Sequence, residues 1–274
     1  MKIAVVLTCF NRCEKTKKCL LSLINGNPSV DFTFYVVNDA STDSTEEELK
    51  SINAKYHNII IINTPGRLFY SKGMRKGMEY LNNSNNTSDY VLLVNDDVEF
   101  NDQAIQKLIS ESKEKDNSVI VGATCDNNGF FTYGGVKKIK HSVGIKYISN
   151  TDSDIPCDSF NANCVLIPWK HYAGCPPMDG YYAHAAGDFD YGFDMHRHGA
   201  KIYTSSFFVG TCNRNSTNGT WHDKNLPSLV RLRKKETAKG LPFKSYFHYL
   251  HKNYSLGHAI LFSITPYIKI LLKK

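Results

Sequence analysis

Residues 91–100 read VLLVNDDVEF and join an apolar strand to two adjacent carboxylates. The apolar run at 91–94, which follows Tyr90, predicts a strand that is buried on both faces. Asp96 and Asp97 come directly after it, where two neighbouring carboxylates repel each other and lose hydration. This pattern indicates either a solvated turn before the next helix or a site that binds a hard divalent cation through oxygen ligands.

The segments on either side of this strand alternate between apolar runs and helical patterns. Such an alternation predicts an α/β fold with a mostly parallel sheet and helices on both faces. Ligands of such sheets bind beyond the carboxyl ends of the strands, so the polar residues there are the candidates for a site. We expect strands at 2–8, 32–37, 59–62, 90–94 and 119–122, and helices at 12–24, 44–52, 70–81 and 102–113.

The second half of the chain is less regular. A hairpin over 134–148, a short strand at 164–168 and a helix at 188–199 are expected there. After a soft boundary near residue 220, basic and aromatic segments predict a C-terminal helical extension.

The net charge of the 274-residue chain is +7, and it is unevenly distributed. Residues 221–274 contain eleven Lys and Arg against two acidic residues, or +9, so the first 220 residues carry about −2. A near-neutral body does not favour a general nucleic-acid binder, whose basic face would lie on the body. The basic, aromatic and aliphatic tail is typical of helices that contact anionic lipid, and a helical unit packed on the body or on a second subunit is the alternative.

The cysteines and the apolar segments bear on the cellular compartment. Eight cysteines occur without a CxxC pair or zinc-type spacing, which indicates reduced thiols in a cytosolic protein. The apolar start at 1–12 lacks a small-residue cleavage site and is interpreted as a strand rather than a signal peptide. The apolar stretch at 256–274 is interrupted by His258, Pro266 and Lys269, which excludes a clean membrane-spanning helix.

Two further carboxylates lie where chemistry is expected. Asp39 ends the second strand, where it could accept hydrogen bonds from a nucleobase imide or a ribose, or cap the following helix. Asp188 opens the helix at 188–199 after the aromatic and small residues of 181–187, and it could take a proton from a hydroxyl. The dipole of a helix also stabilises acids in its first turn, so a structural role is the alternative for Asp188 and Asp190.

Four motifs follow one another along the chain: LTCFNR at 7–12, VVNDASTDST at 36–45, VNDDV at 94–98 and GDFDYGFDMHRHG at 187–199. In this order they resemble the motifs of family 2 glycosyltransferases of the GT-A fold, of the type that builds bacterial surface polysaccharide. The resemblance covers about residues 1–205. It implies a GT-A domain over 1–220, with a nucleotide-sugar-binding half at 1–123 and an acceptor-binding half at 124–220, followed by a basic amphipathic helical tail at 221–274.

The resemblance implies a role for each matched residue. Asp188 matches the catalytic base, and Asp97 matches the acid that holds the metal, Mn²⁺ or Mg²⁺. Donor-binding roles fall on the remaining matched residues: Thr8, Phe10, Arg12, Asp39, Arg67 and Asp96.

A late histidine often completes the metal site in this family, and His222 and His184 are the candidates. Asp190 is expected to be a structural or acceptor-binding partner of the base. Trp221 is expected either to stack on an acceptor sugar or to anchor a loop.

Three positions depart from the family pattern. The usual acid before Asp39 is Asn38, the usual acid before Asp188 is Gly187, and an Arg common six residues after the base is Asp194. These departures affect the expected contact with the nucleobase and the expected binding of the acceptor more than the expected reaction.

The resemblance implies an inverting, metal-dependent transfer of a sugar from a nucleoside-diphosphate donor to a hydroxyl of a glycan or lipid-linked acceptor. Because Asp39 suits a pyrimidine imide, a UDP-sugar or dTDP-rhamnose is the expected donor. The protein is expected on the cytoplasmic face of the plasma membrane as a peripheral protein, and a homo-oligomer is compatible with this expectation. The alternatives are a sugar-nucleotide pyrophosphorylase, although 8–16 (TCFNRCEKT) lacks the glycine-rich loop of that class, and a non-catalytic nucleotide-binding adaptor.

Overall fold

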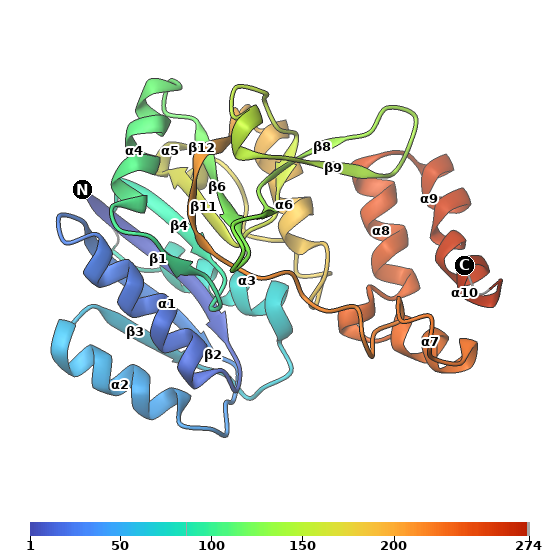
Figure 1. Ribbon diagram of the computed structural model, residues 1–274, viewed down its shortest axis with the longest axis horizontal. Coiled ribbons are helices and arrows are strands. Elements are labelled where there is room, and N and C mark those ends of the chain that lie inside the picture. The colour runs from blue at the N-terminus through green and yellow to red at the C-terminus, as the bar shows by residue number, and fades with distance from the viewer. Residues whose placement is uncertain (86, 273–274) are drawn as a thin grey trace.

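The computed structural model describes residues 1–85 and 87–272. Within these residues a nine-stranded sheet has the order β3-β2-β1-β4-β11-β6-β12-β5, with β7 paired to β6, and a three-stranded sheet has the order β10-β8-β9 (Figure 1). The strands are β1 (Lys2–Cys9), β2 (Asp31–Asn38), β3 (Ile59–Asn63), β4 (Tyr90–Val94), β5 (Glu99–Phe100), β6 (Val119–Cys125), β7 (Phe131–Tyr133), β8 (Gly135–Lys138), β9 (Ile145–Ile148), β10 (Ser159–Phe160), β11 (Cys164–Pro168) and β12 (Ile202–Thr211). The helices are α1 (Cys13–Gly26), α2 (Thr45–Tyr56), α3 (Phe69–Asn82), α4 (Ala104–Glu114), α5 (Trp169–Ala173), α6 (Gly187–Arg197), α7 (Ser228–Lys235), α8 (Phe243–Asn253), α9 (Leu256–Ser263) and α10 (Thr265–Leu271), with short 3-10 helices at Asn150–Asp152 and Ala238–Gly240.

The N-terminal half of the main sheet is parallel. Strand β1 lies between β2 and β4 and pairs with both in parallel, and β2 pairs in parallel with β3. The predicted mostly parallel α/β fold with a C-terminal helical extension is therefore confirmed. The five strands and four helices expected over the first 122 residues all form, with boundaries that differ by a few residues.

The C-terminal half of the main sheet departs from the parallel pattern. Strand β11 lies in the middle of the sheet and pairs antiparallel with both β4 and β6. The sequence predicts this strand but not its place or direction, because a short run of apolar residues specifies neither. Strand β12, which pairs in parallel with β6, is not among the strands that the sequence predicts.

Alternate residues of the central strands enter two cores on opposite faces of the sheet. Leu92 and Val94 of β4 belong to a core that includes residues of α1, α2 and α4, whereas Val91 and Leu93 belong to a core that includes residues of α3, α5 and α6. Full burial on both faces explains the continuous apolar run at 91–94. Helix α3 approaches β1 closely because Gly73 lacks a side chain; a Cβ there would lie 2.5 Å from Thr8 Oγ1.

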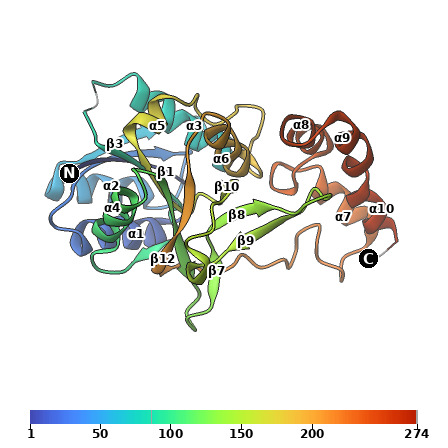
Figure 2. The same cartoon turned by 90° about the horizontal axis from the view of Figure 1, so that it is seen from above.

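Helices α7 to α10 form a C-terminal helical unit beside the sheet domain (Figure 2). The predicted hairpin forms as β8 and β9, and it extends from the sheet domain toward α8 and α9 (Figure 1). A third core joins α6 to α8 and α9, with Phe193, Leu250 and Ala259 among its buried residues. No helix within residues 1–85 and 87–272 has the length and apolar character required to cross a membrane. The domain limits given above stay a prediction.

Candidate active site

Asp96 and Asp97 lie directly after β4 at the carboxyl edge of the parallel strands. The guanidinium of Arg12, from the loop after β1, lies 2.7 Å from Asp96 Oδ1 and 3.1 Å from Asp97 Oδ2. A cation therefore bridges the two carboxylates and offsets their repulsion. The Asp96 carboxylate is nearly fully buried and also accepts a hydrogen bond from Thr16 Oγ1 at 3.4 Å.

Burial is the largest influence on the pKa of the Asp96 carboxyl. It raises the pKa of the Asp96 carboxyl to about 6, against the opposing effect of Arg12. A carboxyl in this state ionises readily when a further cation approaches, because the cation favours the charged form.

The carboxylate of Asp39 organises the loop between β3 and α3. Its Oδ1 accepts a hydrogen bond from Thr64 Oγ1 at 2.8 Å, and its Oδ2 accepts from the backbone amides of Leu68 at 2.9 Å and Phe69 at 3.1 Å. The neighbouring Arg67 is exposed and has a left-handed backbone, with φ of 68°. Asp39 thus holds Arg67 at the edge of the sheet where the donor is expected.

Two residues predicted beside Asp39 occupy different environments. Phe10 is 54% exposed in the loop after β1. Thr8 faces α3, and its hydroxyl donates to the carbonyl of Val37 at 3.2 Å.

Asp188 lies in the first turn of α6 and is buried. Its Oδ2 accepts hydrogen bonds from Asn161 Nδ2 at 3.1 Å and from the amide of Ala162 at 3.3 Å, and its Oδ1 accepts from the amide of Phe189 at 2.9 Å. Burial nevertheless raises the pKa of the Asp188 carboxyl to about 6. Such a carboxyl is poised near neutral pH to accept a proton.

Residues 161–163 connect Asp188 to the carboxylate pair. Because β11 runs antiparallel to β4, with Cys164 opposite Val94, the segment before β11 lies beside residues 95–97. Asn163 pairs with Asn95 through both backbone and side chain, with Asn95 Nδ2 donating to Asn163 Oδ1 at 2.8 Å. The amide of Ala162 binds Asp188 at the other end of this segment. Residues 161–163 therefore contact both the candidate base Asp188 and the loop that carries Asp96 and Asp97, which we call the donor corner.

The remaining predicted residues lie elsewhere. Asp190 has no exposed surface and faces away from the sheet domain, with its carboxylate 2.6 Å from both Lys252 Nζ and Asn253 Nδ2 of α8. These contacts fit the structural one of its two expected roles. The ring centroids of Trp221 and His222 lie 3.6 Å apart with the rings tilted by 32°, and the Trp221 carbonyl accepts a hydrogen bond from Arg231 Nε at 2.8 Å.

Neither candidate histidine is grouped with Asp97 in the part of the chain that the structure describes. Burial lowers the pKa of His222, and the nearby cations Arg231 and Lys235 lower it further. His184 packs edge-on against Phe69 and Tyr70, and burial lowers its pKa to about 4. Residues 1–85 and 87–272 contain no group of three or more His, Cys, Asp or Glu that could hold a metal.

Comparison with known proteins decides the family. A model of the family described as "Glycosyl transferase family 2" matches residues 4–161, which is more than half of the chain. The chain belongs to glycosyl transferase family 2. The family resemblance expected from the four motifs is therefore confirmed.

Similar proteins agree with this family 2 assignment. A poly(ribitol-phosphate) beta-glucosyltransferase of Bacillus spizizenii (strain ATCC 23059 / NRRL B-14472 / W23) is 27% identical over 130 residues, which is 47% of this chain but only 20% of that protein. Residues 1–349 of S. aureus TarS match 98% of this chain and 81% of theirs, with a TM-score of 0.58 and 13% identity. The mannosyltransferase PcManGT of Pyrobaculum calidifontis, solved with GDP-Man and Mn²⁺, matches 99% and 73%, with a TM-score of 0.58 and 10% identity. At these identities the two structures show a shared fold.

The structure adds two residues to the family 2 motifs. Tyr70, in the first turn of α3, is half-buried, and desolvation raises the pKa of its hydroxyl together with the negative charges of Asp188, Asp97 and Asp96. That hydroxyl donates to the carbonyl of Ala162 at 3.4 Å. Cys212, just after β12, lies with its Sγ 3.7 Å from Asp97 Oδ1, and burial raises the pKa of its thiol to about 12, so it remains a neutral donor.

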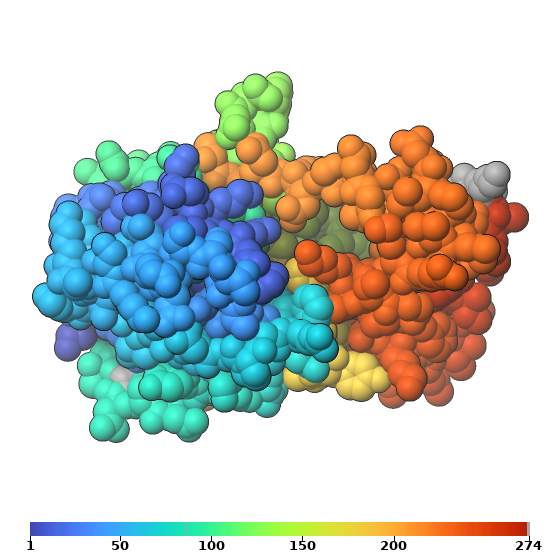
Figure 3. Space-filling view, turned by 90° about the horizontal axis from the view of Figure 1, so that it is seen from below, coloured from blue at the N-terminus to red at the C-terminus, as the bar shows by residue number. Residues whose placement is uncertain are grey.

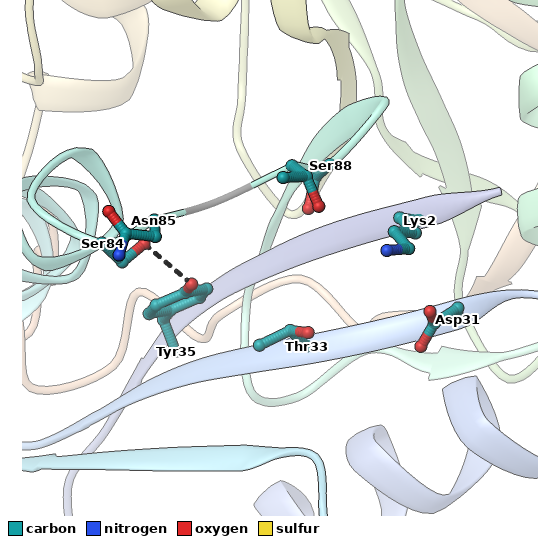
Figure 4. Close-up of a pocket in the computed structure, with 8 residues that line it drawn as sticks. Lys2, Asp31, Thr33, Tyr35, Ser84, Asn85 and Ser88 are labelled. Atoms are coloured by element: carbon teal, nitrogen blue, oxygen red, sulfur yellow. Dashed lines mark hydrogen bonds between the residues drawn. The ribbon is translucent and has the colours of Figure 1, made fainter.

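The polar pocket drawn in Figure 4 is not formed by the candidate site residues. That pocket, of about 210 Å³, is bordered by Lys2, Asp31, Thr33 and Tyr35 at the amino ends of β1 and β2. It therefore lies at the edge of the sheet opposite Asp96 and Asp97. Figure 3 shows a hollow between the N-terminal half and the C-terminal helical unit. Arg12 of the first and Lys239 of the second both lower the pKa of His184, so both sides approach it.

Proposed function

We propose that this family 2 protein is an inverting, metal-dependent glycosyltransferase. It moves a sugar from a nucleoside-diphosphate donor, a UDP-sugar or dTDP-rhamnose, to a hydroxyl of a glycan or lipid-linked acceptor. The observation that carries the proposal is the pairing of two sites: the carboxylates Asp96 and Asp97 on one side of residues 161–163 and the buried Asp188 on the other. TarS has also been solved with UDP-GlcNAc, which supports a nucleotide-sugar donor.

In the proposed complex the donor lies along the carboxyl edge of β1, β2 and β4. The nucleobase of the donor would lie near Asp39 and Phe10, and its diphosphate would lie near Arg67 and Arg12. Arg67 is exposed and Arg12 is 39% exposed, so both cations are accessible to phosphate oxygens. Their charge would stabilise the departing nucleoside diphosphate more strongly in the transition state than in the ground state.

The acidic pair fits a divalent cation that is shared with the donor. Asp97 supplies carboxylate oxygens, and Mg²⁺ or Mn²⁺ is commonly held by one or two carboxylates together with substrate phosphates and water. When bound, the ion supplies Lewis-acid stabilisation of the leaving diphosphate. Arg12 bridges the pair and would neutralise Asp96 while Asp97 serves the ion. A role for His222 or His184 as a further ligand stays a prediction.

Asp188 is the proposed base. With its pKa raised to about 6, it is largely ionised at neutral pH and still basic enough to accept a proton from an acceptor hydroxyl. Asn161 and the Ala162 amide fix the carboxylate. Oδ1 of Asn161 is buried without a hydrogen-bond partner in the described residues, which suits a group that receives the acceptor hydroxyl. Attack on the anomeric carbon from the face opposite the diphosphate inverts its configuration.

The acceptor is proposed to belong to a cell-surface polymer. The Bacillus relative is named for a poly(ribitol-phosphate) acceptor, and this chain aligns with about a fifth of that protein. Arg214 near Tyr147 and Lys239 near His184 are exposed cations, which would favour an acceptor that bears phosphate. Trp221 stays a candidate for contact with an acceptor sugar.

The C-terminal helical unit is proposed to contact an anionic membrane on its cytoplasmic face. Apolar side chains of α9 and α10 are exposed, among them Leu261 at 71% and Ile268 at 50%. Helix α7, with Arg233 and Lys234, packs beside α10, where Ser228 Oγ donates to the carbonyl of Ile270 at 3.1 Å. Exposed apolar residues beside cations are the combination that binds at the membrane interface.

A hydrolysis screen of nucleotide sugars with Mg²⁺ or Mn²⁺ tests the enzyme proposal. We expect at least one UDP- or dTDP-sugar to be hydrolysed, and Asp188→Asn to lower kcat by about 10²- to 10⁴-fold, the range for loss of a general base. Asp97→Ala is expected to abolish the metal-dependent rate. Asp116→Asn is the matched control, because Asp116 is 88% exposed and pairs only loosely with Lys201.

Three outcomes would contradict the proposal. A donor that binds without turnover would indicate a nucleotide-binding adaptor. Formation of a nucleotide sugar from a sugar phosphate and a nucleoside triphosphate would indicate a pyrophosphorylase. Rates for both site variants equal to that of Asp116→Asn would remove the assigned roles of Asp97 and Asp188.

A further inference from the structure

Lys252, near the end of α8, is the centre of a cluster of carboxylates. Its ammonium lies 2.6 Å from Asp190 Oδ2, 2.9 Å from Asp194 Oδ2 and 3.3 Å from Asp179 Oδ2. Asp190 and Asp194 belong to α6, the helix that carries Asp188, and Asp179 belongs to the loop before it. Two further side chains complete the cluster: His248 Nε2 lies 3.0 Å from Asp179 Oδ2, and the guanidinium of Arg197 lies 2.5 Å from Asp194 Oδ1.

The uncharged amide of Asn253, the next residue, connects the same helix to α8 through hydrogen bonds to two charged side chains. Its Nδ2 donates to Asp190 Oδ1 at 2.6 Å, and its Oδ1 accepts from Arg197 at 2.9 Å. Its backbone carbonyl accepts from Lys138 of the β8–β9 hairpin at 2.5 Å. The end of α8 therefore contacts both α6, the helix that carries Asp188, and the β8–β9 hairpin.

The charge of Lys252 is needed because Asp190 is completely buried. An ionised carboxylate without a partner is strongly disfavoured in such a place, so the position of Asp190 depends on the ammonium beside it. The hydrophobic contacts of Phe193 with α8 act at the same junction.

This cluster lies on the opposite side of α6 from the candidate active site. Residues two positions apart on a helix point about 200° from each other, so Asp188 faces residues 161–162 while Asp190 faces α8. On the body side, the start of α3 holds the preceding segment, since Ser71 Oγ donates to the carbonyl of His184 at 2.6 Å. The first turn of α6 is thus clamped between the sheet domain and the C-terminal helical unit.

We propose that Lys252 and Asn253 are positioning residues for the base Asp188. They hold Asp190 from the far side of α6, which fixes the first turn of that helix and places the Asp188 carboxylate against Asn161 and Ala162. Sugar transfer then depends on the docking of the C-terminal helical unit, although no residue of α8 contacts the reacting atoms. This inference rests on the proposed function of Asp188.

Amide hydrogen exchange and kinetics together test the inference, with Lys252→Met as the decisive variant. We expect faster exchange in residues 186–197 and a kcat about 10- to 100-fold lower for hydrolysis of the nucleotide sugar found in the screen, since a displacement of about 1 Å has an effect of this size. The KM for the donor should stay within about twofold, because the donor corner is supported by residues 95–97 and 163. Lys252→Arg should restore most of kcat, because it keeps the charge.

The controls separate positioning from general damage. Lys244→Met removes an exposed cation from the first turns of the same helix and should match wild type in both measurements. Asn253→Ala keeps the Lys252 ion pairs, so it is expected to fold even if Lys252→Met does not, and it should lower kcat several-fold at unchanged KM.

Two results would overturn the inference. One is a kcat for Lys252→Met and Asn253→Ala equal to that of Lys244→Met. The other is faster exchange in α6 without loss of kcat, which would make the cluster structural only. If wild type turned over no donor, the proposed function would fail instead, and the exchange comparison would still decide whether Lys252 holds α6.

Discussion

At the scale of single residues, two buried carboxyls with pKa values raised to about 6 face the candidate active site from different elements. Their environments differ. Asp96 is paired with Arg12, whereas Asp188 is surrounded by the neutral donors Asn161, Ala162 and Phe189. Binding of a metal and a diphosphate would change the charge around Asp96 far more than that around Asp188. The two ionisations should therefore separate in the enzyme-donor complex.

The pH dependence of donor hydrolysis follows from this difference. Asp188 acts as a base only when ionised, so kcat should fall as pH falls through about 6 and level off above about 7. This fall in kcat is measured in the complex saturated with donor, where a bound metal would favour the ionised form of Asp96. Asp188→Asn should remove the fall together with most of the rate, and Asp116→Asn should keep it. A kcat that rises toward lower pH, or that is flat from pH 5 to 8 in wild type, would exclude Asp188 as the base.

At the scale of elements, the sequence predicts the parallel half of the sheet well. Apolar runs such as 91–94 and helices with an acidic first turn such as α2 are local signals. The position of the polar residues that end β1, β2 and β4 follows from the direction of the strands. These local signals are sufficient to place Arg12, Asp39 and Asp96 at one edge of the sheet. Departures from the family pattern at Asn38 and Gly187 are also visible in the sequence.

Local sequence signals do not predict the residues that connect the carboxylate pair Asp96 and Asp97 to Asp188. Asn163 meets Asn95, and Tyr70 meets Ala162, across 68 and 92 positions. Both contacts exist because β11 inserts antiparallel beside β4, and a five-residue apolar run cannot specify that pairing. Asp190 shows the same limit, because the partners that separate its role from that of Asp188 lie on α8, about 60 positions along the chain.

Gly187 stands where the family pattern has an acid, and close packing against Ser71 explains why a residue without a side chain fits there. A Cβ at this position would lie 2.4 Å from Ser71 Oγ and 2.6 Å from Ser71 Cβ, so the start of α6 packs directly on the start of α3. We expect Gly187→Ala to lower the free energy of unfolding by about 1–3 kcal/mol, the usual effect of overpacking. Urea denaturation measures the change.

Two further variants control this prediction. Gly257→Ala in α9 meets only Ser255 Oγ at 3.8 Å and should raise stability by up to about 1 kcal/mol, through helix propensity alone. Adding Ser71→Gly to Gly187→Ala removes the clashing atoms and should recover part of the loss. If Gly187→Ala and Gly257→Ala were equally stable, the close contact between α3 and α6 would be refuted.

At the scale of the whole molecule, the C-terminal helical unit has two faces with different tasks. Its inner face packs on α6 through Leu250 and the Lys252 cluster, which ties it to the candidate base. Leu261, Ile264 and Ile268 are exposed on its other side, the outer face. The cations Arg233 and Lys269 of the same unit are exposed as well. Contact of the outer face with a membrane would hold the hollow of Figure 3 near a lipid-linked acceptor.

Vesicle flotation of the full chain tests this arrangement. We expect the protein to float with phosphatidylglycerol vesicles and much less with phosphatidylcholine, because each Lys or Arg near an anionic surface contributes about 1 kcal/mol. Leu261→Glu with Ile268→Glu should abolish flotation, and about 0.5 M NaCl should weaken it, because salt screens the attraction between the cations and the lipid. Phe130→Glu changes a side chain of the sheet domain that is 70% exposed and should float like wild type. If the double variant floats equally well, or if it instead converts a dimer into a monomer in light scattering while wild type ignores lipid, the outer face packs on protein and the membrane proposal is wrong.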